Sequence, residues 1–153
     1  MKIITYPNPI LRKKSLPVKN PTDPAIQKLV LEMTKVLRAS QGIGLAAPQV
    51  GENLQVCLIE IENELFILFN PQIKSLSGKK IIAEEGCLSF PGKFLPVERY
   101  EKIKVKALDS SGKKQIIRAR GLFARALQHE IDHLSGELFI DKVIDQTELK
   151  NRL

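Results

Sequence analysis

The stretch Gln128-His129-Glu130-Ile131-Asp132-His133-Leu134-Ser135-Gly136 holds the only two histidines among the 153 residues of this chain. The histidines are four positions apart, and positions i and i+4 of an α-helix share one face, so both imidazoles can reach one metal ion. Glu130 lies about 100° further around the helix, where it can touch a water on that ion without being a ligand. The pattern therefore predicts a metal site carried by a helix.

Apolar residues surround most of this helix, which we expect to start just after Gly121. Leu122 and Ala126 fall within about 60° of His129 on a helical wheel. The side opposite the apolar arc collects the polar residues Arg125, Gln128, Asp132 and Ser135. A helix that is apolar over more than half of its circumference is largely buried, and its histidine and acidic side chains then need partners. Gly136 fits a C-terminal cap.

A catalytic metal site commonly has three protein ligands and one open position. The third histidine of the metzincin pattern would stand at position 139, but this chain has Phe139 there. Glu137 and Glu148 are the only glutamates further downstream. Cys87, in a glycine-flanked turn, is the better candidate, because a Cys-His-His set with an open position suits Zn²⁺, Fe²⁺ or a similar ion. The alternative is a pair of core histidines hydrogen-bonded to neighbours.

The length and composition are typical of a single soluble domain spanning residues 1–153, with 43% hydrophobic and 27% charged residues. No apolar run approaches the roughly 20 residues that cross a bilayer, and the first residues lack the apolar stretch of a signal peptide. Two cysteines are too few for a disulfide framework. These features predict a cytoplasmic protein.

The hydrophobic periodicity predicts an α+β fold, with antiparallel strands packed around the central metal helix and an amphipathic helix before them. Thr22 or Asp23 can cap that first helix, which begins at Pro24, ends near Ser40 and is stopped by Gly42. The expected strands are 54–61 with 65–69 as a hairpin, 73–77 with 80–83 around a turn at Gly78, and 102–108 with 115–119 around a turn at 109–112.

Three further segments have less regular patterns. Two prolines in Tyr6–Leu11 indicate an extended arm over the core. The glycine- and alanine-rich segment 42–51 indicates neither a stable helix nor a good strand, and its small residues would let it line a pocket. The tail Val143–Leu153 could form a short last helix. The Cys57 side chain fits a buried thiol within its strand.

The net charge of +7 raises the question of a nucleic-acid partner. The lysines are dispersed, and there are only two tyrosines and no tryptophan to stack on bases. A solvated basic surface is therefore the favoured interpretation, which leaves open a weak attraction to a polyanion such as the ribosome.

Taken together, three segments resemble the peptide deformylase family. They are Gly42-Ile43-Gly44-Leu45-Ala46-Ala47-Pro48-Gln49, Glu85-Gly86-Cys87-Leu88-Ser89 and Gln128-His129-Glu130-Ile131-Asp132-His133. Their order and separations fit as well, and the opening Tyr-Pro-x-Pro-Ile-Leu-Arg resembles the family's N-terminal segment. The resemblance covers essentially the whole chain. It implies an enzyme that hydrolyses the formyl group from the N-terminal formyl-methionine of new polypeptides and releases formate.

The resemblance also implies roles for individual residues. It implies Cys87, His129 and His133 as ligands of one divalent metal ion, Fe²⁺ in physiological conditions, with Zn²⁺, Ni²⁺ or Co²⁺ able to replace it. It implies Glu130 as the general acid and base. The implied carbonyl-polarising groups are the Gln49 side chain and the Leu88 backbone N–H, and the implied methionine pocket comprises Ile43, Gly44, Leu122 and Ala126. We expect Asp132 to be structural, with Arg99 as its ion-pair partner.

The implied partners are nascent formyl-methionyl peptides, with no membrane and no specific nucleic acid, and we expect a monomer. The short segment after the metal helix makes stable docking on the ribosome doubtful. Two other functions remain open on the sequence alone. One is a metal-dependent peptidase or other amidase, which formate release would distinguish. The other is a non-catalytic, RNA-binding module whose structural metal would need a fourth protein ligand.

Overall fold

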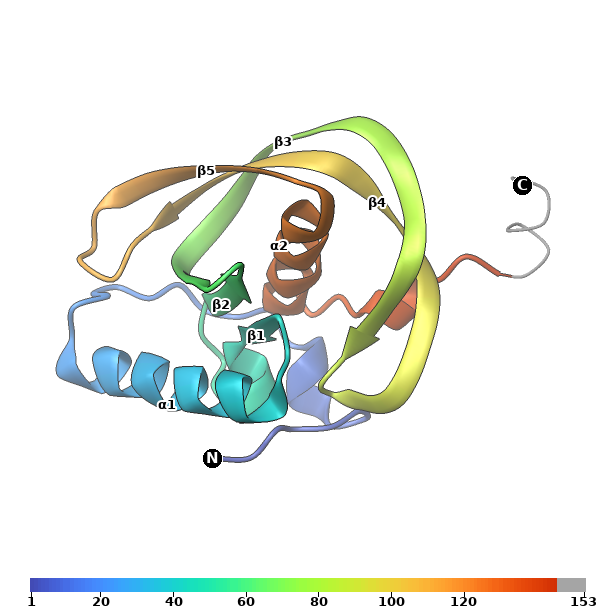
Figure 1. Ribbon diagram of the computed structural model, residues 1–153. Coiled ribbons are helices and arrows are strands. Elements are labelled where there is room, and N and C mark those ends of the chain that lie inside the picture. Colours follow the sequence, from blue (N-terminus) through green and yellow to red (C-terminus); the bar gives the residue numbers. More distant parts are fainter. Residues whose placement is uncertain (146–153) are drawn as a thin grey trace.

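The computed structural model describes residues 1–145 and has the predicted α+β architecture (Figure 1). Five antiparallel strands form one sheet in the order β1-β2-β3-β4-β5. The elements are α1 (Pro24–Ser40), β1 (Gly44–Ala46), β2 (Val56–Ile61), β3 (Glu64–Cys87), β4 (Phe90–Leu108), β5 (Lys114–Arg120) and α2 (Gly121–Leu134), with 3₁₀ turns at Pro9–Arg12, Ala47–Val50 and Phe139–Lys142. No helix among the described residues is long and apolar enough to cross a membrane.

The amphipathic helix α1 begins where the sequence predicted. Asp23 is the N-cap, and its carboxylate accepts a hydrogen bond of 2.8 Å from the Ala25 N–H, with Pro24 at the first helical position. The helix ends at Ser40, but Gln41 rather than Gly42 adopts the left-handed conformation that stops it, with φ of 58°.

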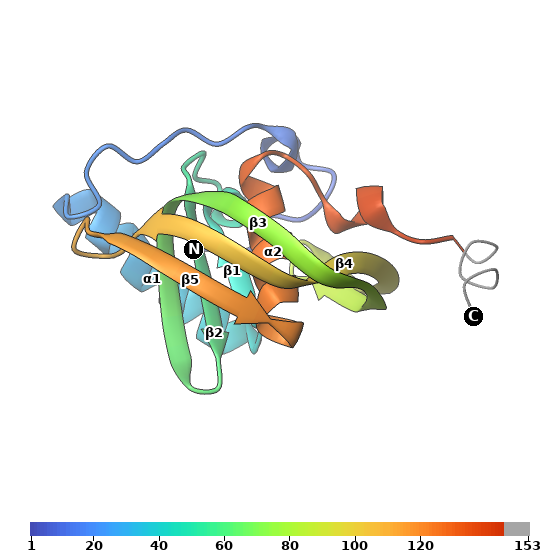
Figure 2. The same ribbon diagram turned by 90° about the horizontal axis from the view of Figure 1, so that it is seen from above.

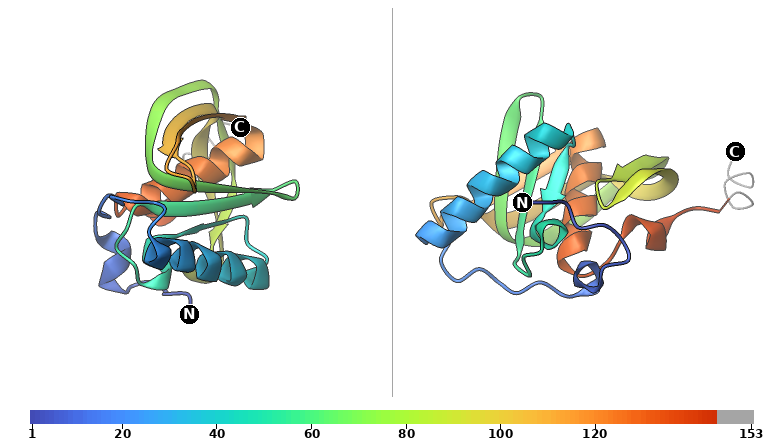
Figure 3. Two further views of the ribbon diagram at one scale, coloured as in Figure 1. Left: turned by 90° about the vertical axis from the view of Figure 1, so that its left-hand side faces the viewer. Right: turned by 90° about the horizontal axis from the view of Figure 1, so that it is seen from below.

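The two long helices lie on opposite sides of the β1–β2–β3 end of the sheet (Figure 3). Alternate residues of β2 face alternate helices: Cys57 and Ile59 belong to the buried cluster that includes α2, whereas Val56 and Leu58 belong to the cluster that includes α1. As predicted, α2 is largely buried, and every residue from 127 to 134 is inaccessible or nearly so. The central helix is therefore the core element of the fold.

The strand 54–61 and its partner are confirmed as the β2–β3 hairpin, in which Val56 pairs with Phe69. The predicted turn at Gly78 is wrong. Residues 73–77 and 80–83 both belong to the single strand β3, which pairs with β4 along almost its entire length. Gly78 has φ of +77° and sits where the register shifts between Ser77 and Lys80, so it forms a bulge. A bulge and a turn share the same glycine signal, which explains the error.

Three other expectations need amendment. The segment 42–51 is ordered as strand β1 and a 3₁₀ turn, and the arm at Tyr6–Leu11 includes the start of the 3₁₀ turn Pro9–Arg12. The last helix predicted over Val143–Leu153 falls mostly outside the described residues, and 143–145 are not helical. Gly136 follows α2 as predicted, and its N–H donates to the His133 carbonyl at 3.1 Å.

Candidate metal centre and active site

Side chains from two distant parts of the sequence converge between β3 and α2. The ligand atoms of Cys87, His129 and His133 all lie within 4.8 Å of one another. Cys87 is the last residue of β3, and its Sγ lies 3.4 Å from His133 Nε2. The two histidines come from the last two turns of α2, on the face that the i and i+4 spacing predicts. The structure thus brings together the three ligands expected from the sequence.

A buried carboxylate fixes the orientation of one imidazole. Glu85 Oε1 lies 2.8 Å from His129 Nδ1, which leaves the other ring nitrogen of His129 for Cys87 and His133. Carboxylate partners of this kind set the tautomer and the ring orientation of metal-binding histidines. Burial alone would raise the pKa of Glu85, but hydrogen bonds from His129 and Arg99 outweigh it and hold that pKa well below its usual range. Glu85 is therefore an anion at neutral pH.

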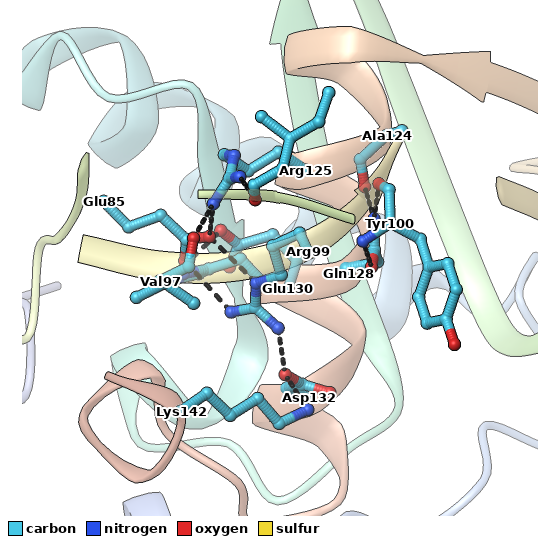
Figure 4. A network of polar contacts seen from close by, with 12 residues as sticks. Glu85, Val97, Arg99, Tyr100, Ala124, Arg125, Gln128, Glu130, Asp132 and Lys142 are labelled. Atoms are coloured by element: carbon cyan, nitrogen blue, oxygen red, sulfur yellow. Dashed lines mark hydrogen bonds and ion pairs between the residues drawn. The ribbon is translucent and has the colours of Figure 1, made fainter. Parts of the chain in front are cut away.

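Arg99 links this carboxylate to the polar side of α2 (Figure 4). It donates to both oxygens of Glu85, at 2.8 and 3.0 Å, and its third contact is the Asp132 carboxylate at 2.6 Å. The predicted Arg99–Asp132 ion pair is confirmed. Lys142 also binds Asp132, at 2.8 Å. Asp132 thus has two cationic partners, as a structural group would.

Arg125 ties the β3–β4 hairpin to α2. Its guanidinium donates to Glu85 Oε2 at 2.6 Å, to the Val97 carbonyl at 3.0 Å and to the Ile81 carbonyl at 2.7 Å. Val97 is in β4 and Ile81 is in β3, so one helical side chain holds both strands (Figure 4). The position of Cys87, two residues beyond Glu85, depends on this connection.

Glu130 projects into the site without a fixed hydrogen-bond partner. Among the described residues, its Oε1 has none, while its Oε2 lies 4.0 Å from His129 Nε2. The carboxylate rests against the Gly44 backbone so closely that a Cβ at Gly44 would lie 2.5 Å from Oε2. Burial raises the pKa of Glu130 to about 7, although His129 acts in the opposite direction. A carboxyl group with such a pKa can hold and release a proton near neutral pH.

The Gln49 side chain reaches the site from the 3₁₀ turn after β1. Its Oε1 accepts a hydrogen bond of 2.9 Å from the Ala46 N–H, which fixes the amide so that Nε2 faces Cys87 Sγ, 3.5 Å away. Nε2 also lies 3.2 Å from the Ser89 hydroxyl, which donates to the Ile4 carbonyl at 2.7 Å. The amide N–H groups of Gln49 are therefore aimed at the pocket by a chain of hydrogen bonds.

The pKa values of the two histidines are compatible with binding of a metal cation. Burial lowers the pKa of His133 well below its usual value, so its ring is neutral and able to ligate. Burial also acts to lower the pKa of His129, but Glu130, Cys87 and Glu85 outweigh it and raise that pKa to about 10. The acidic groups that raise this pKa would also attract a metal cation to His129. One thiolate and two imidazoles are good ligands for first-row transition metals, so the residues fit a divalent ion.

A cavity of about 450 Å³ opens onto these groups. Every predicted site residue except His133 lines it, namely Ile43, Gly44, Gln49, Cys87, Leu88, Leu122, Ala126, His129 and Glu130. Leu122 and Ala126 lie on the same side of α2 as His129, as the helical wheel predicted. The exposed Phe94 forms part of the rim, with its ring against Gly86. The predicted groups therefore surround one open space.

Sequence reasoning missed three residues that organise the site. Glu85 and Ser89 stand inside a recognised segment, but neither received a role, and Arg125 was placed only on the polar side of the helix. The sequence could have indicated that such a partner exists, because a buried imidazole requires a hydrogen-bond partner for its second nitrogen. Which carboxylate supplies it depends on strand pairing that spacing alone does not reveal.

Comparison with known proteins agrees with this geometry. The family model described as polypeptide deformylase matches residues 1–149. The peptide deformylase of Syntrophobacter fumaroxidans is 45% identical over 148 residues, which cover 94% of this chain and 86% of that protein. Among solved structures, a Synechococcus elongatus peptide deformylase in complex with actinonin is 38% identical with a TM-score of 0.93, covering 99% of this chain and 82% of that one. The Thermotoga maritima peptide deformylase is 37% identical with a TM-score of 0.91, covering 94% and 97%. The chain therefore belongs to the polypeptide deformylase family and is a hydrolase that removes the N-formyl group from newly made polypeptides.

Proposed function

We propose that Cys87, His129 and His133 hold the divalent ion on which this deformylase depends. The observation that carries the proposal is the convergence of their three ligand atoms within 4.8 Å, beside a cavity that Cys87, His129 and Glu130 line. When bound, such an ion supplies Lewis acidity, which makes a nucleophilic water available near neutral pH. Three ligands leave a position open for chemistry.

Glu130 is the proton carrier in this proposal. Its Oε1, which has no hydrogen-bond partner among residues 1–145, accepts a proton from the attacking water as the new C–O bond forms at the formyl carbon. The same atom then delivers the proton to the amine nitrogen as the formamide C–N bond breaks. The products are formate and a free N-terminus, so atoms and protons balance.

The Gln49 amide and the Leu88 backbone N–H are the donors that we propose for the negative charge on the formyl oxygen. Gln49 is oriented by its bond from the Ala46 N–H, and Leu88 directly follows Cys87 in the turn between β3 and β4. Donors fixed before the reaction stabilise the developing charge without reorganising.

Ile43, Gly44, Leu122 and Ala126 form the proposed pocket for the methionine side chain. Their location in one cavity with Glu130 and Cys87 supports this assignment. The Gly44 backbone lies at the edge strand β1, where an extended peptide can add main-chain hydrogen bonds. Such binding places the formyl group at the inner end of the cavity.

Fe²⁺ is the ion that we propose for physiological conditions, with Zn²⁺, Ni²⁺ and Co²⁺ able to occupy the same ligands. Imidazole and thiolate ligands accept all of these ions, so availability and oxidation decide between them. A ferrous site with a thiolate ligand is expected to lose activity in air. Comparison of aerobic and anaerobic preparations, with iron and thiol oxidation followed together, tests this identity.

The cellular setting is a further part of the proposal. We propose that residues 1–153 act as one catalytic domain, as a monomer, in the cytoplasm, where new polypeptides carry their formyl groups. The substrates are nascent formyl-methionyl peptides. The net charge of +7 supports a weak association with the ribosome, whose RNA is a polyanion.

The decisive experiment is anaerobic loading with Fe²⁺ or Ni²⁺, followed by measurement of formate release from a formyl-methionyl peptide. Glu130→Gln, which retains the shape of the side chain, serves as the matched variant. We expect formate release from the parent protein and a loss of about 10²–10⁴-fold in the variant at equal metal content. A folded, metal-loaded parent that released no formate would overturn the proposal, and peptide-bond cleavage instead would indicate a peptidase.

A further inference from the structure

The outward face of the paired strands β4 and β5 is unusually basic. Residues of β4 alternate, and Ile103, Val105 and Ala107 are buried beneath the sheet in the cluster that includes α2. The eight outward positions of the paired region are Lys102, Lys104, Lys106 and Leu108 in β4 and Lys114, Ile116, Arg118 and Arg120 in β5. Six of these eight residues are cations and none is an acid.

The register places like charges directly opposite one another. Lys102 pairs with Arg120, and Lys104 pairs with Arg118. Like charges at directly opposed positions of an antiparallel pair destabilise the sheet. Within residues 1–145, none of these four cations forms an ion pair that would relieve the repulsion. An anionic partner bound across the two strands would relieve it.

The neighbouring strand supplies hydroxyl groups to the same face. Ser77 pairs with Lys102 and Ser75 pairs with Lys104, on the β3 side of β4. A cavity of about 490 Å³ on the sheet is lined by both serines and by the four opposed cations. Ammonium, guanidinium and hydroxyl donors are the groups that bind phosphate oxygens in nucleic acids.

An aromatic ring extends this face. Tyr100 is two residues before Lys102, so it occupies an outward position, and its ring points away from α2 (Figure 4). Lys80, its partner across the ladder, holds its Nζ 5.2 Å from the ring centroid. Aromatic rings beside cationic side chains on a strand surface are stacking platforms for single-stranded nucleic acids.

The basic face lies apart from the active site. It points away from α2, and within residues 1–145 only its Leu108 end packs against the cluster that includes α1 (Figure 2). None of the residues that line this cavity also lines the catalytic one. A partner on this face would therefore leave the peptide pocket open.

We propose that the outward face of β4 and β5 binds the phosphate backbone of RNA without sequence specificity, with Tyr100 stacking on a base. The inference deepens the proposed association with the ribosome and rests on it, since it gives that association a surface and a chemistry. RNA is favoured over an anionic membrane because the face combines hydrogen-bond donors with a ring that can stack on a base. The RNA-binding proposal does not depend on the catalytic roles of Glu130 or Gln49.

The test uses the full-length, metal-loaded protein and a fluorescein-labelled, mixed-sequence single-stranded RNA of about 20 nucleotides, read by anisotropy at several salt concentrations. Six phosphate contacts to single-stranded RNA predict a log–log salt slope of about −4, hence about a 10²–10³-fold loss of affinity between about 50 and 200 mM salt. The double substitution Lys104→Gln with Arg118→Gln should reduce the slope by about 1.4. Lys102→Gln with Arg120→Gln is an independent second pair.

The matched control removes the same net charge elsewhere, by Lys28→Gln with Lys35→Gln on the exposed side of α1. We expect this control to bind RNA nearly as well as the parent, Tyr100→Leu to bind more weakly with an unchanged salt slope, and all variants to release formate at the parental rate. Parental RNA affinity in both sheet variants, or an equal loss in the α1 control, would refute the proposal. So would binding to phosphatidylserine vesicles without binding to RNA. A parent that binds RNA but releases no formate would instead contradict the catalytic proposal alone.

Discussion

The buried guanidinium of Arg99 offers the sharpest test of how the site is supported. Substitution of Arg99 by leucine removes two hydrogen bonds to Glu85 and one to Asp132. The side chain is only 3% exposed, so water cannot replace those bonds. Glu85 keeps Arg125 and His129, and Asp132 keeps Lys142, but each carboxylate loses a direct cationic partner.

The expected loss of folding stability in Arg99→Leu depends on the burial of the ion pairs rather than on the number of hydrogen bonds removed. Removing one partner of a buried ion pair typically costs about 3–5 kcal/mol, because a charge is left desolvated and incompletely paired. For a domain of this size, each kcal/mol lowers the midpoint of thermal unfolding by about 2–4 °C. Arg99→Leu should therefore lower it by about 6–20 °C. Urea unfolding should give a matching loss of free energy at an unchanged m-value.

Arg38 provides a matched control. Its guanidinium also makes three hydrogen bonds to a carboxylate, Glu60, at 3.1 to 3.2 Å, but its side chain is 58% exposed. Solvent screens an exposed pair, so Arg38→Leu should shift the midpoint far less than Arg99→Leu does. If Arg99→Leu and Arg38→Leu lowered stability equally, the reasoning from burial would be refuted.

Three further predictions concern the site and the surface. Gln49→Leu should lower the rate of formate release by about 10²–10³-fold at unchanged metal content, and an unchanged rate would remove Gln49 from the reaction. Gly44→Ala would put a methyl group 2.5 Å from Glu130 Oε2, so we expect a loss on the order of 10²-fold in rate with a nearly unchanged unfolding temperature; retention of activity would show that the carboxylate can shift freely. The hydrogen bond from Arg12 holds the pKa of Asp141 below its usual value, so its stabilisation is present above the unfolded pKa of about 3.9 and disappears as pH falls through the lower folded value. The free energies of unfolding of the parent and Asp141→Asn, measured in urea, should differ by less than about 1 kcal/mol at neutral pH and converge in acid, since the pair is half-exposed.

Local patterns predicted the parts of the fold that depend on neighbouring residues. The 3.6-residue period located α1 and α2, and the capping residues placed the start of α1 at Pro24. The i and i+4 spacing put His129 and His133 on one face for the same reason. Strand alternation identified 102–108, because lysines and buried aliphatic residues take turns there. Each of these inferences needs only a few consecutive residues.

Long-range pairing is the part that local patterns could not supply. The glycine at Gly78 interrupts alternation in the same way whether the chain turns or bulges, and only pairing with β4 decides that it bulges. The partners of Glu85 come from α2 and β4, and no spacing in the sequence brings Arg125 to a strand carbonyl. The ionic network therefore became visible only in three dimensions.

The three metal ligands also differ in whether local spacing or long-range pairing places them. Helical geometry alone aligns His129 with His133, but Cys87 lies 46 residues before His133 and depends on where β3 ends. Glu85 connects the two halves, because it is two residues from Cys87 in the same region of β3 and also orients the His129 ring at 2.8 Å. The arginines that hold Glu85 therefore position a thiolate and an imidazole through one carboxylate. This makes the geometry of the site a property of the strand–helix packing, rather than of the histidine motif from which it was first recognised.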